Sequence, residues 1–76
     1  MHIASDTERK KLGANVRNAR RSTKHSQEKL AEKVGVGRER ISRIERGTHT
    51  PDPFLLRRIA KACSVSLDSL FTDLDD

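Results

Sequence analysis

The sequence predicts an all-α domain of five helices, and three observations support this prediction. Apolar residues recur at helical spacing along the chain, and no segment shows the apolar–polar alternation of a half-buried strand. The length of 76 residues fits one domain, which buries only about 60–65% of the surface that its unfolded chain exposes. Because 33% of the residues are apolar and 36% are charged, we expect a thin core.

The first helix is predicted to begin near Ser5, which has capping-box spacing to Glu8. Its helical pattern ends at Ser22. Gly13 lies inside this helix, where glycine costs about 1 kcal/mol relative to alanine, so we expect another element to approach closely there. The expected buried face, with Arg20 beside it, consists of Leu12, Val16 and Ala19.

Two shorter helices follow. Ser26 is a favourable N-cap for the second helix, and Gly35 stands where a left-handed C-cap is needed. Its expected buried residues are Leu30, Ala31 and Val34. Only residues 35–37 separate it from a third helix over residues 38–46, which ends at Gly47. The buried residues expected in the third helix are Ile41 and Ile44.

The last part of the chain predicts two more helices. Asp52 is a plausible N-cap, and Pro53 suits the first helical position because its missing N–H costs nothing there. The buried stripe of this fourth helix is Leu56, Ile59, Ala60 and Cys63. Ser66 is expected to cap a short fifth helix that buries Leu67, Leu70 and Phe71.

The net charge of +5 is distributed unevenly along the chain. Residues 1–50 contain 13 Lys and Arg against 6 Asp and Glu, whereas residues 51–76 contain 3 against 5. A basic front and an acidic rear favour a polyanionic partner on one side of the domain. The alternative, which charge by itself leaves open, is a solvated surface that serves only solubility.

Several classes of protein are poorly supported. The longest apolar run is residues 54–56, against about 20 residues needed to span a bilayer, and no signal peptide is apparent. We therefore expect a cytoplasmic protein without a membrane partner. One Cys excludes an internal disulfide, and three His with one Cys lack zinc spacing, so we expect no metal and no cofactor. Paired carboxylates, an activated nucleophile and a phosphate loop are missing, so we do not expect an enzyme. We also expect no small-molecule ligand, because 76 residues leave no room for a ligand-binding domain.

The most informative stretch is residues 26–47, SQEKLAEKVGVGRERISRIERG. Two short helices joined by a glycine-containing turn of three residues form a helix-turn-helix, whose second helix can enter a major groove. Four of the nine residues in that second helix are Arg, which is unfavourable for a core helix. The residues left to face outward are Arg38, Glu39, Arg40, Ser42, Arg43 and Arg46.

Three segments in order make the chain similar to a known family. They are residues 26–31 (SQEKLA), 41–47 (ISRIERG) and 65–71 (VSLDSLF). From about residue 12 to residue 71, the chain resembles the phage repressor and Cro-like helix-turn-helix regulators of the Xre family. The resemblance implies a compact, five-helix, lambda-repressor-like DNA-binding domain. We expect it to occupy residues 1–76, with the helix-turn-helix core at residues 26–47.

The resemblance implies that four side chains read base edges in double-stranded DNA. They are Arg38, Glu39, Ser42 and Arg43. An Arg can pair with guanine O6 and N7, and a Glu can accept from cytosine N4, so a half-site containing G·C pairs is expected. The alternative for Glu39 is an ion pair with Arg43, four residues further along the same helix.

The resemblance also implies contacts to the DNA backbone, which fix register without reading sequence. These positions are Gln27, Arg40, Arg46 and Thr48, with Lys24 as a weaker candidate. The alternative for Arg40 and Arg46 is a solvated face. In addition, the family's pattern implies a partly buried ion pair between Arg20 and Glu45, whose main effect would be to orient the third helix.

Four residues depart from the family's pattern, and the roles of three of them stay open. Gly37 occupies an N-cap position where Ser or Thr is common, at only a small cost. His25 stands where an apolar residue is usual, and either a backbone partner or a phosphate contact would explain it. Phe54 either folds inward or joins an interface, and Cys63 is expected to act as a small buried apolar residue.

One recognition helix reads only about 4–5 base pairs, so we expect a homodimer on half-sites ~34 Å apart. The pairing surface is expected within about residues 63–74, at Phe71, Leu74 and Leu67. The predicted function is a bacterial or phage transcriptional regulator on a palindromic operator, of the restriction–modification controller or phage-repressor type. The alternatives are an antitoxin that binds a toxin and regulates its own operator, and a helical module that does not touch DNA.

Overall fold

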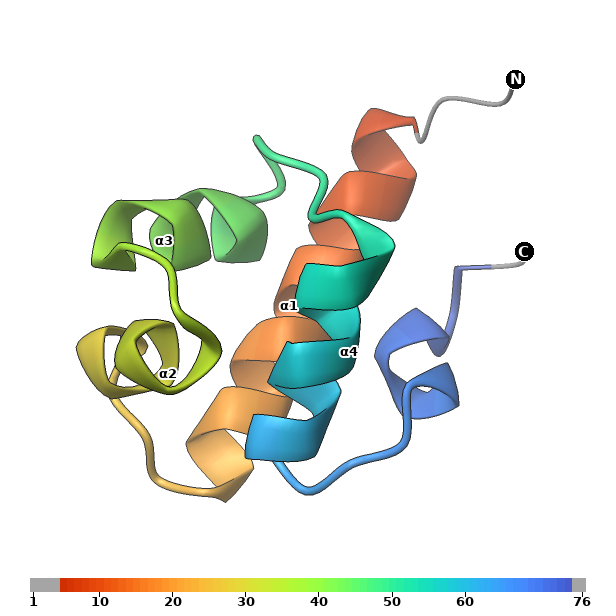
Figure 1. Ribbon diagram of the computed structural model, residues 1–76. Coiled ribbons are helices and arrows are strands. Elements are labelled where there is room, and N and C mark those ends of the chain that lie inside the picture. Colours follow the sequence, from red (N-terminus) through yellow and green to blue (C-terminus); the bar gives the residue numbers. More distant parts are fainter. Residues whose placement is uncertain (1–4, 75–76) are drawn as a thin grey trace.

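The computed structural model describes residues 5–74, which form four α-helices and a final 3₁₀ turn (Figure 1). The predicted all-α class is confirmed, but the fifth helix is not formed. The elements in chain order are α1 (Asp6–Ser22), α2 (Gln27–Val34), α3 (Arg38–Arg46), α4 (Pro53–Ala62) and η1 (Asp68–Phe71). No helix in the described range is long and apolar enough to cross a bilayer.

α1 lies between the helix-turn-helix and the C-terminal turn (Figure 1). It packs against α3 and also against η1, while α2 packs against both α3 and α4. In Figure 1, α2 and α3 lie together on one side of α1, and η1 lies on the other side. The helix-turn-helix and the C-terminal turn are therefore held by one common helix.

The predicted N-caps are confirmed, because polar side chains bond the free N–H groups at three helix starts. The Ser5 hydroxyl accepts from the Glu8 N–H at 3.1 Å, and the Glu8 carboxylate accepts from the Ser5 N–H at 2.9 Å. Ser26 caps α2 in the same way, with its hydroxyl 3.0 Å from the Lys29 nitrogen. Asp52 caps α4 by accepting from the Leu55 N–H at 2.9 Å.

The helix ends at the helix-turn-helix depend on glycine. Gly35 closes α2 with φ 78°, and Gly47 closes α3 with φ 80°, both in the left-handed region. The two C-caps are therefore as the sequence predicts.

The core is formed by apolar side chains from every element, and all of the predicted stripe residues in α1 to α4 are buried, with Cys63 directly after α4. Leu55, which is 1% exposed, and Pro51 are also buried, although neither was predicted. The buried apolar side chains are Leu12, Val16, Ala19, Leu30, Ala31, Val34, Ile41, Ile44, Leu55, Leu56, Ile59, Ala60, Cys63 and Leu70.

The close approach expected at Gly13 is also confirmed. A Cβ atom at Gly13 would lie 2.3 Å from the Ile44 carbonyl oxygen and 2.6 Å from that of Glu45. Only a residue without a side chain lets the end of α3 pack this tightly on α1.

The predicted fifth helix is a four-residue 3₁₀ turn. Ser66 does accept from the Ser69 N–H at 3.2 Å, but Thr72 leaves the helical region with ψ 134°, so the turn ends at once. Such a short turn directs only one of its side chains, Leu70, into the core. Leu67 and Phe71 are 42% and 41% exposed, so the prediction that they are buried in a helix is wrong.

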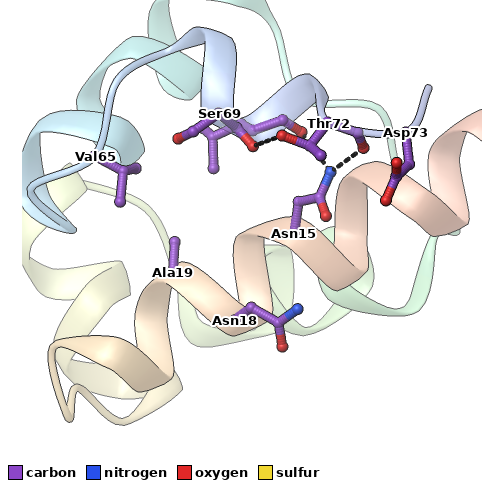
Figure 2. A pocket seen from close by; sticks show the side chains of 8 residues that line it. Asn15, Asn18, Ala19, Val65, Ser69, Thr72 and Asp73 are labelled. Atoms are coloured by element: carbon purple, nitrogen blue, oxygen red, sulfur yellow. Dashed lines mark hydrogen bonds between the residues drawn. The ribbon is translucent and has the colours of Figure 1, made fainter. Parts of the chain in front are cut away.

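Asn15 of α1 holds this C-terminal segment with hydrogen bonds. Its side-chain amide donates to the carbonyl oxygens of Leu70 at 2.9 Å and Thr72 at 2.8 Å (Figure 2). Beside these bonds lies an open hollow of about 440 Å³ between α1 and η1. Its lining residues include Asn18, Ala19 and Val65.

Candidate nucleic-acid interface

A tight turn places α3 against α2. Val36 donates its N–H to the Ala31 carbonyl at 3.0 Å, which fixes the chain directly after Gly35. Gly37 then begins α3 in an extended conformation, with φ −78° and ψ 155°, and no side chain caps this helix start. The turn between the two helices is thus three residues long, as in the helix-turn-helix that the sequence predicts.

α3 has one buried face and one exposed face. Ile41 and Ile44 are 0% and 1% exposed, and Glu45 is the third buried residue. Ser42 is half-buried, and the exposed residues are Arg38, Glu39, Arg40, Arg43 and Arg46. No ion pair joins Glu39 to Arg43 within residues 5–74, so the structure does not form that alternative pair.

The buried Glu45 carboxylate is the charged centre behind this face. Arg20 of α1 donates from Nε to Oε2 at 2.6 Å and from Nη2 to Oε1 at 3.0 Å. This bidentate geometry suits a guanidinium and a carboxylate and ties the end of α3 to α1. It places together the two residues for which the resemblance implied an ion pair.

Two further side chains reach the same carboxylate, and sequence reasoning did not predict them. Gln27, at the start of α2, donates from Nε2 to Glu45 Oε1 at 3.0 Å. Arg17 of α1 forms an ion pair with the same oxygen, with its Nε 3.5 Å away. The sequence signal for this contact was the position of Arg17, which is three residues before Arg20 and so on the same side of α1. Glu45 therefore links α1, α2 and α3.

The partners keep this carboxylate charged despite its burial. Burial alone would raise the pKa of Glu45, but hydrogen bonds from Arg20 and Gln27 and the nearby positive charge hold that pKa below its usual value. The hydrogen bond to Glu45 correspondingly raises the pKa of Arg20 above its already high ordinary value. The site thus contains a true ion pair with an added amide donor.

Arg20 also anchors the loop that leads into α2. Its Nη1 donates to the His25 carbonyl oxygen at 2.8 Å. The His25 ring lies half-buried with Nδ1 3.0 Å from the Thr23 hydroxyl oxygen. In the same loop, Lys24 is exposed and has a left-handed backbone with φ 62°.

The loop after α3 is ordered by its own hydrogen bonds. Thr48 donates from its N–H and its hydroxyl to the Arg43 carbonyl oxygen, at 3.0 and 3.2 Å. Arg9 of α1 donates from Nε to the Gly47 carbonyl oxygen at 3.3 Å. Arg46 folds back to the Ser42 carbonyl oxygen at 3.4 Å. The basic face of α3 therefore continues into a loop of fixed shape.

The remaining candidate residues lie outside the helix-turn-helix, in the part of the chain that follows it. Phe71 and Leu67 are exposed on or next to η1, while Leu74 is partly buried and packs against the core. Phe54 at the start of α4 is 72% exposed, so it does not fold inward. Cys63 is buried, which raises the pKa of its thiol and leaves it an apolar core residue. No group of metal-ligating side chains exists within residues 5–74.

The chain is similar to known regulators in sequence. The helix-turn-helix family pattern matches residues 16–70. The uncharacterized HTH-type transcriptional regulator YgzD of Bacillus subtilis is 43% identical over 47 residues, covering 62% of this chain and 71% of that protein. An uncharacterized transcriptional regulator in the ATPase CF(0) region of Rhodospirillum rubrum is 38% identical over 64 residues, covering 84% and 59%.

The fold is similar to solved regulators as well. The restriction–modification controller protein C.AhdI from Aeromonas hydrophila superposes with a TM-score of 0.82 at 28% identity, over 86% of this chain and 98% of that one. The P22 c2 repressor, solved with a synthetic operator, superposes with a TM-score of 0.75 at 33% identity, over 80% and 92%. Sequence, fold and the basic face of α3 agree, and the chain belongs to the DNA-binding, Xre/Cro-like family of helix-turn-helix transcriptional regulators, which are not enzymes.

Proposed function

We propose that two copies of this chain bind a palindromic operator in double-stranded DNA and read its sequence with α3. The observation that carries the proposal is the division of α3, whose arginines are exposed while Ile41, Ile44 and Glu45 fix its other face. A helix that is held in place by its buried side chains and exposes arginine guanidinium groups to solvent is suited to binding in the major groove of DNA.

Base reading is assigned to the outward side chains near the start and middle of α3. The proposed readers are Arg38, Glu39, Ser42 and Arg43. Arg38 and Arg43 each provide a planar pair of donors that matches guanine O6 and N7. Glu39 provides an acceptor for cytosine N4. We therefore expect G·C pairs in each half-site.

Backbone phosphates are assigned to residues around the reading face. They are Gln27, Arg40, Arg46 and Thr48, with Lys24 in the preceding loop. The bond from Gln27 to Glu45 is compatible with this role, because an amide nitrogen has two hydrogens and the bond uses one. Gln27 is thereby held in place before DNA arrives.

Pairing of two copies is assigned to the C-terminal part, at Phe71, Leu67 and Leu74. Phe71 and Leu67 provide exposed apolar surface that a second copy would cover. A dimer places two copies of α3 on successive turns of the same DNA face, ~34 Å apart. The likeness to a controller protein and to the P22 repressor supports a regulator of the controller or phage-repressor type.

Selection of bound duplexes from a random DNA pool tests the proposal. We expect an inverted repeat with G·C pairs, its half-site centres about 10 base pairs apart. Sedimentation with the selected duplex should give two protein copies per site. An asymmetric single site bound by one copy would contradict the dimer. A selected pool that shares no common sequence would contradict base reading.

A further inference from the structure

The buried Glu45 carboxylate has more cationic partners than it needs. Arg20 already pairs its charge with two hydrogen bonds, at 2.6 and 3.0 Å. Arg17 is a second guanidinium beside the same carboxylate, with Nε 3.5 Å from Oε1. The three side chains together therefore have a surplus of one positive charge.

This surplus lies on Arg17. Its side chain is 41% exposed, whereas the side chains of Arg20 and Glu45 are 11% and 0% exposed. The ion pair with Glu45 is made by Arg17 Nε. Within residues 5–74, no further hydrogen bond or ion pair engages its guanidinium, so its two terminal nitrogens remain available to a ligand.

Arg17 and Gln27 meet at one oxygen atom. Arg17 Nε is 3.5 Å and Gln27 Nε2 is 3.0 Å from Glu45 Oε1, so the Arg17 guanidinium lies beside the start of α2. Gln27 is also the first residue of α2, where unpaired backbone N–H groups and the helix dipole favour negative charge. Two independent features therefore attract an anion to the same place, an available guanidinium and a helix start with a free amide hydrogen.

We propose that Arg17 binds the DNA backbone phosphate that lies at the start of α2, while Glu45 orients its guanidinium from behind. Glu45 does not need both charges of Arg17 and Arg20, because Arg20 and Gln27 already bond the carboxylate; Arg17 can therefore keep its Nε towards Glu45 and use its terminal nitrogens for the phosphate. The proposal rests on the DNA-binding surface proposed above and adds a contact from α1, outside the helix-turn-helix. Arg17 would contribute equally to the affinity for every DNA sequence, because a phosphate contact reads no base.

The salt dependence of binding tests this role. The whole chain is titrated into a fluorescein-labelled, mixed-sequence duplex about three helical turns long, in KCl between about 50 and 200 mM. Arg17→Ala should make the negative slope of log K against log salt shallower by about 0.9 per bound copy. The reason is that a chain with one phosphate contact fewer releases fewer counterions on binding. Arg17→Lys keeps the charge and should keep most of the slope. Arg57→Ala removes one exposed charge from α4 and should leave the slope nearly unchanged.

The outcomes separate the possible roles of Arg17. If it only supports Glu45, Arg17→Ala lowers the thermal midpoint while the salt slope stays at the wild-type value, and the proposal is overturned. The DNA-binding proposal survives that result. If the wild-type chain binds the duplex without any salt dependence, both proposals fail together.

Discussion

The α-carbon of Gly13 packs so closely on Ile44 that a methyl group there would lie 2.3 Å from the Ile44 carbonyl oxygen. This contact is between two backbones, and no flexible side chain can move aside to relieve it. The distance between α1 and α3 is therefore set by the absence of one carbon atom.

Gly13→Ala should destabilise the domain although alanine is the better helix former. The propensity gain of about 1 kcal/mol is outweighed by the displacement of α3, and we expect a net loss of about 1–3 kcal/mol. Urea unfolding followed by circular dichroism measures this. Gly37→Ser is the control, because an added Cβ there would meet no atom beyond its chain neighbours within 4 Å, and it should leave stability equal or raise it by a few tenths of a kcal/mol. Equal stability of Gly13→Ala and wild type would contradict the packing.

Glu45→Gln should be among the most destabilising conservative changes in the chain. It leaves Arg20, whose side chain is only 11% exposed, without a counter-charge, at a cost of about 3 kcal/mol or more. Glu32→Gln is the matched control, because its ion pair with Lys29 at 3.2 Å is exposed and should contribute well under 1 kcal/mol. Similar unfolding midpoints for the two variants would show that the Glu45 cluster is hydrated.

Stability should fall in acid because of Glu45 and Asp52. Hydrogen bonds from Arg20 and Gln27 outweigh burial and lower the folded-state pKa of Glu45, and the Leu55 N–H lowers that of Asp52. A lowered folded-state pKa stabilises the fold above the unfolded value, about 4, and this contribution is lost as pH falls through the folded pKa. Urea unfolding at a series of pH values between neutral and about 3 measures the loss. The decline should be shallower in Glu45→Gln, and parallel curves would contradict this origin.

Arg43 and Arg46 should differ in the kind of binding that they provide. Arg43→Ala should cost about 1–3 kcal/mol at one base pair and relax the preference there. Arg46→Ala should weaken binding to all duplexes alike and lower the salt slope by about 1 per copy. Competition assays with the selected operator and single-base variants distinguish the two. Loss of base preference in Arg46→Ala, with none in Arg43→Ala, would reverse the assignment.

Phe71→Asp should separate two paired copies without unfolding either. The Phe71 side chain is 41% exposed, so a charge there costs the monomer little but opposes burial against a second copy. The dissociation constant of the dimer, measured by sedimentation velocity, should rise by tenfold or more in this variant. Phe54→Asp is the control for an exposed aromatic elsewhere, with 72% exposure, and should leave association unchanged. A shift in Phe54→Asp alone would move the pairing surface to α4.

The sequence predicts the helix-turn-helix well because local signals determine it. Ser26, Gly35 and Gly47 act on the backbone within a few residues, and each adopts the predicted capping conformation. The buried stripes of α1 to α4 follow in the same way from helical periodicity.

The errors come from features that depend on tertiary packing. The segment with Leu67 and Phe71 ends as a short 3₁₀ turn, and the carbonyl oxygens of Leu70 and Thr72 accept from Asn15 of α1; no periodicity shows this tertiary contact. The cluster around Glu45 joins side chains 18 and 25 residues apart in sequence, so Gln27 was expected only at a phosphate. The DNA contacts themselves rest on the family's pattern and on exposure.

The Asn15 bonds have a consequence for the assembly of two copies. α1 holds η1 through Asn15 and holds α3 through Arg20 and Gly13. In a pair joined at η1, this stretch of α1 between Gly13 and Arg20 would fix where each α3 lies relative to the surface that joins the two copies. The operator spacing that such a pair tolerates would then depend on the bonds that hold η1 and α3 to this one helix, and loosening either attachment would widen the range of half-site spacings that is bound.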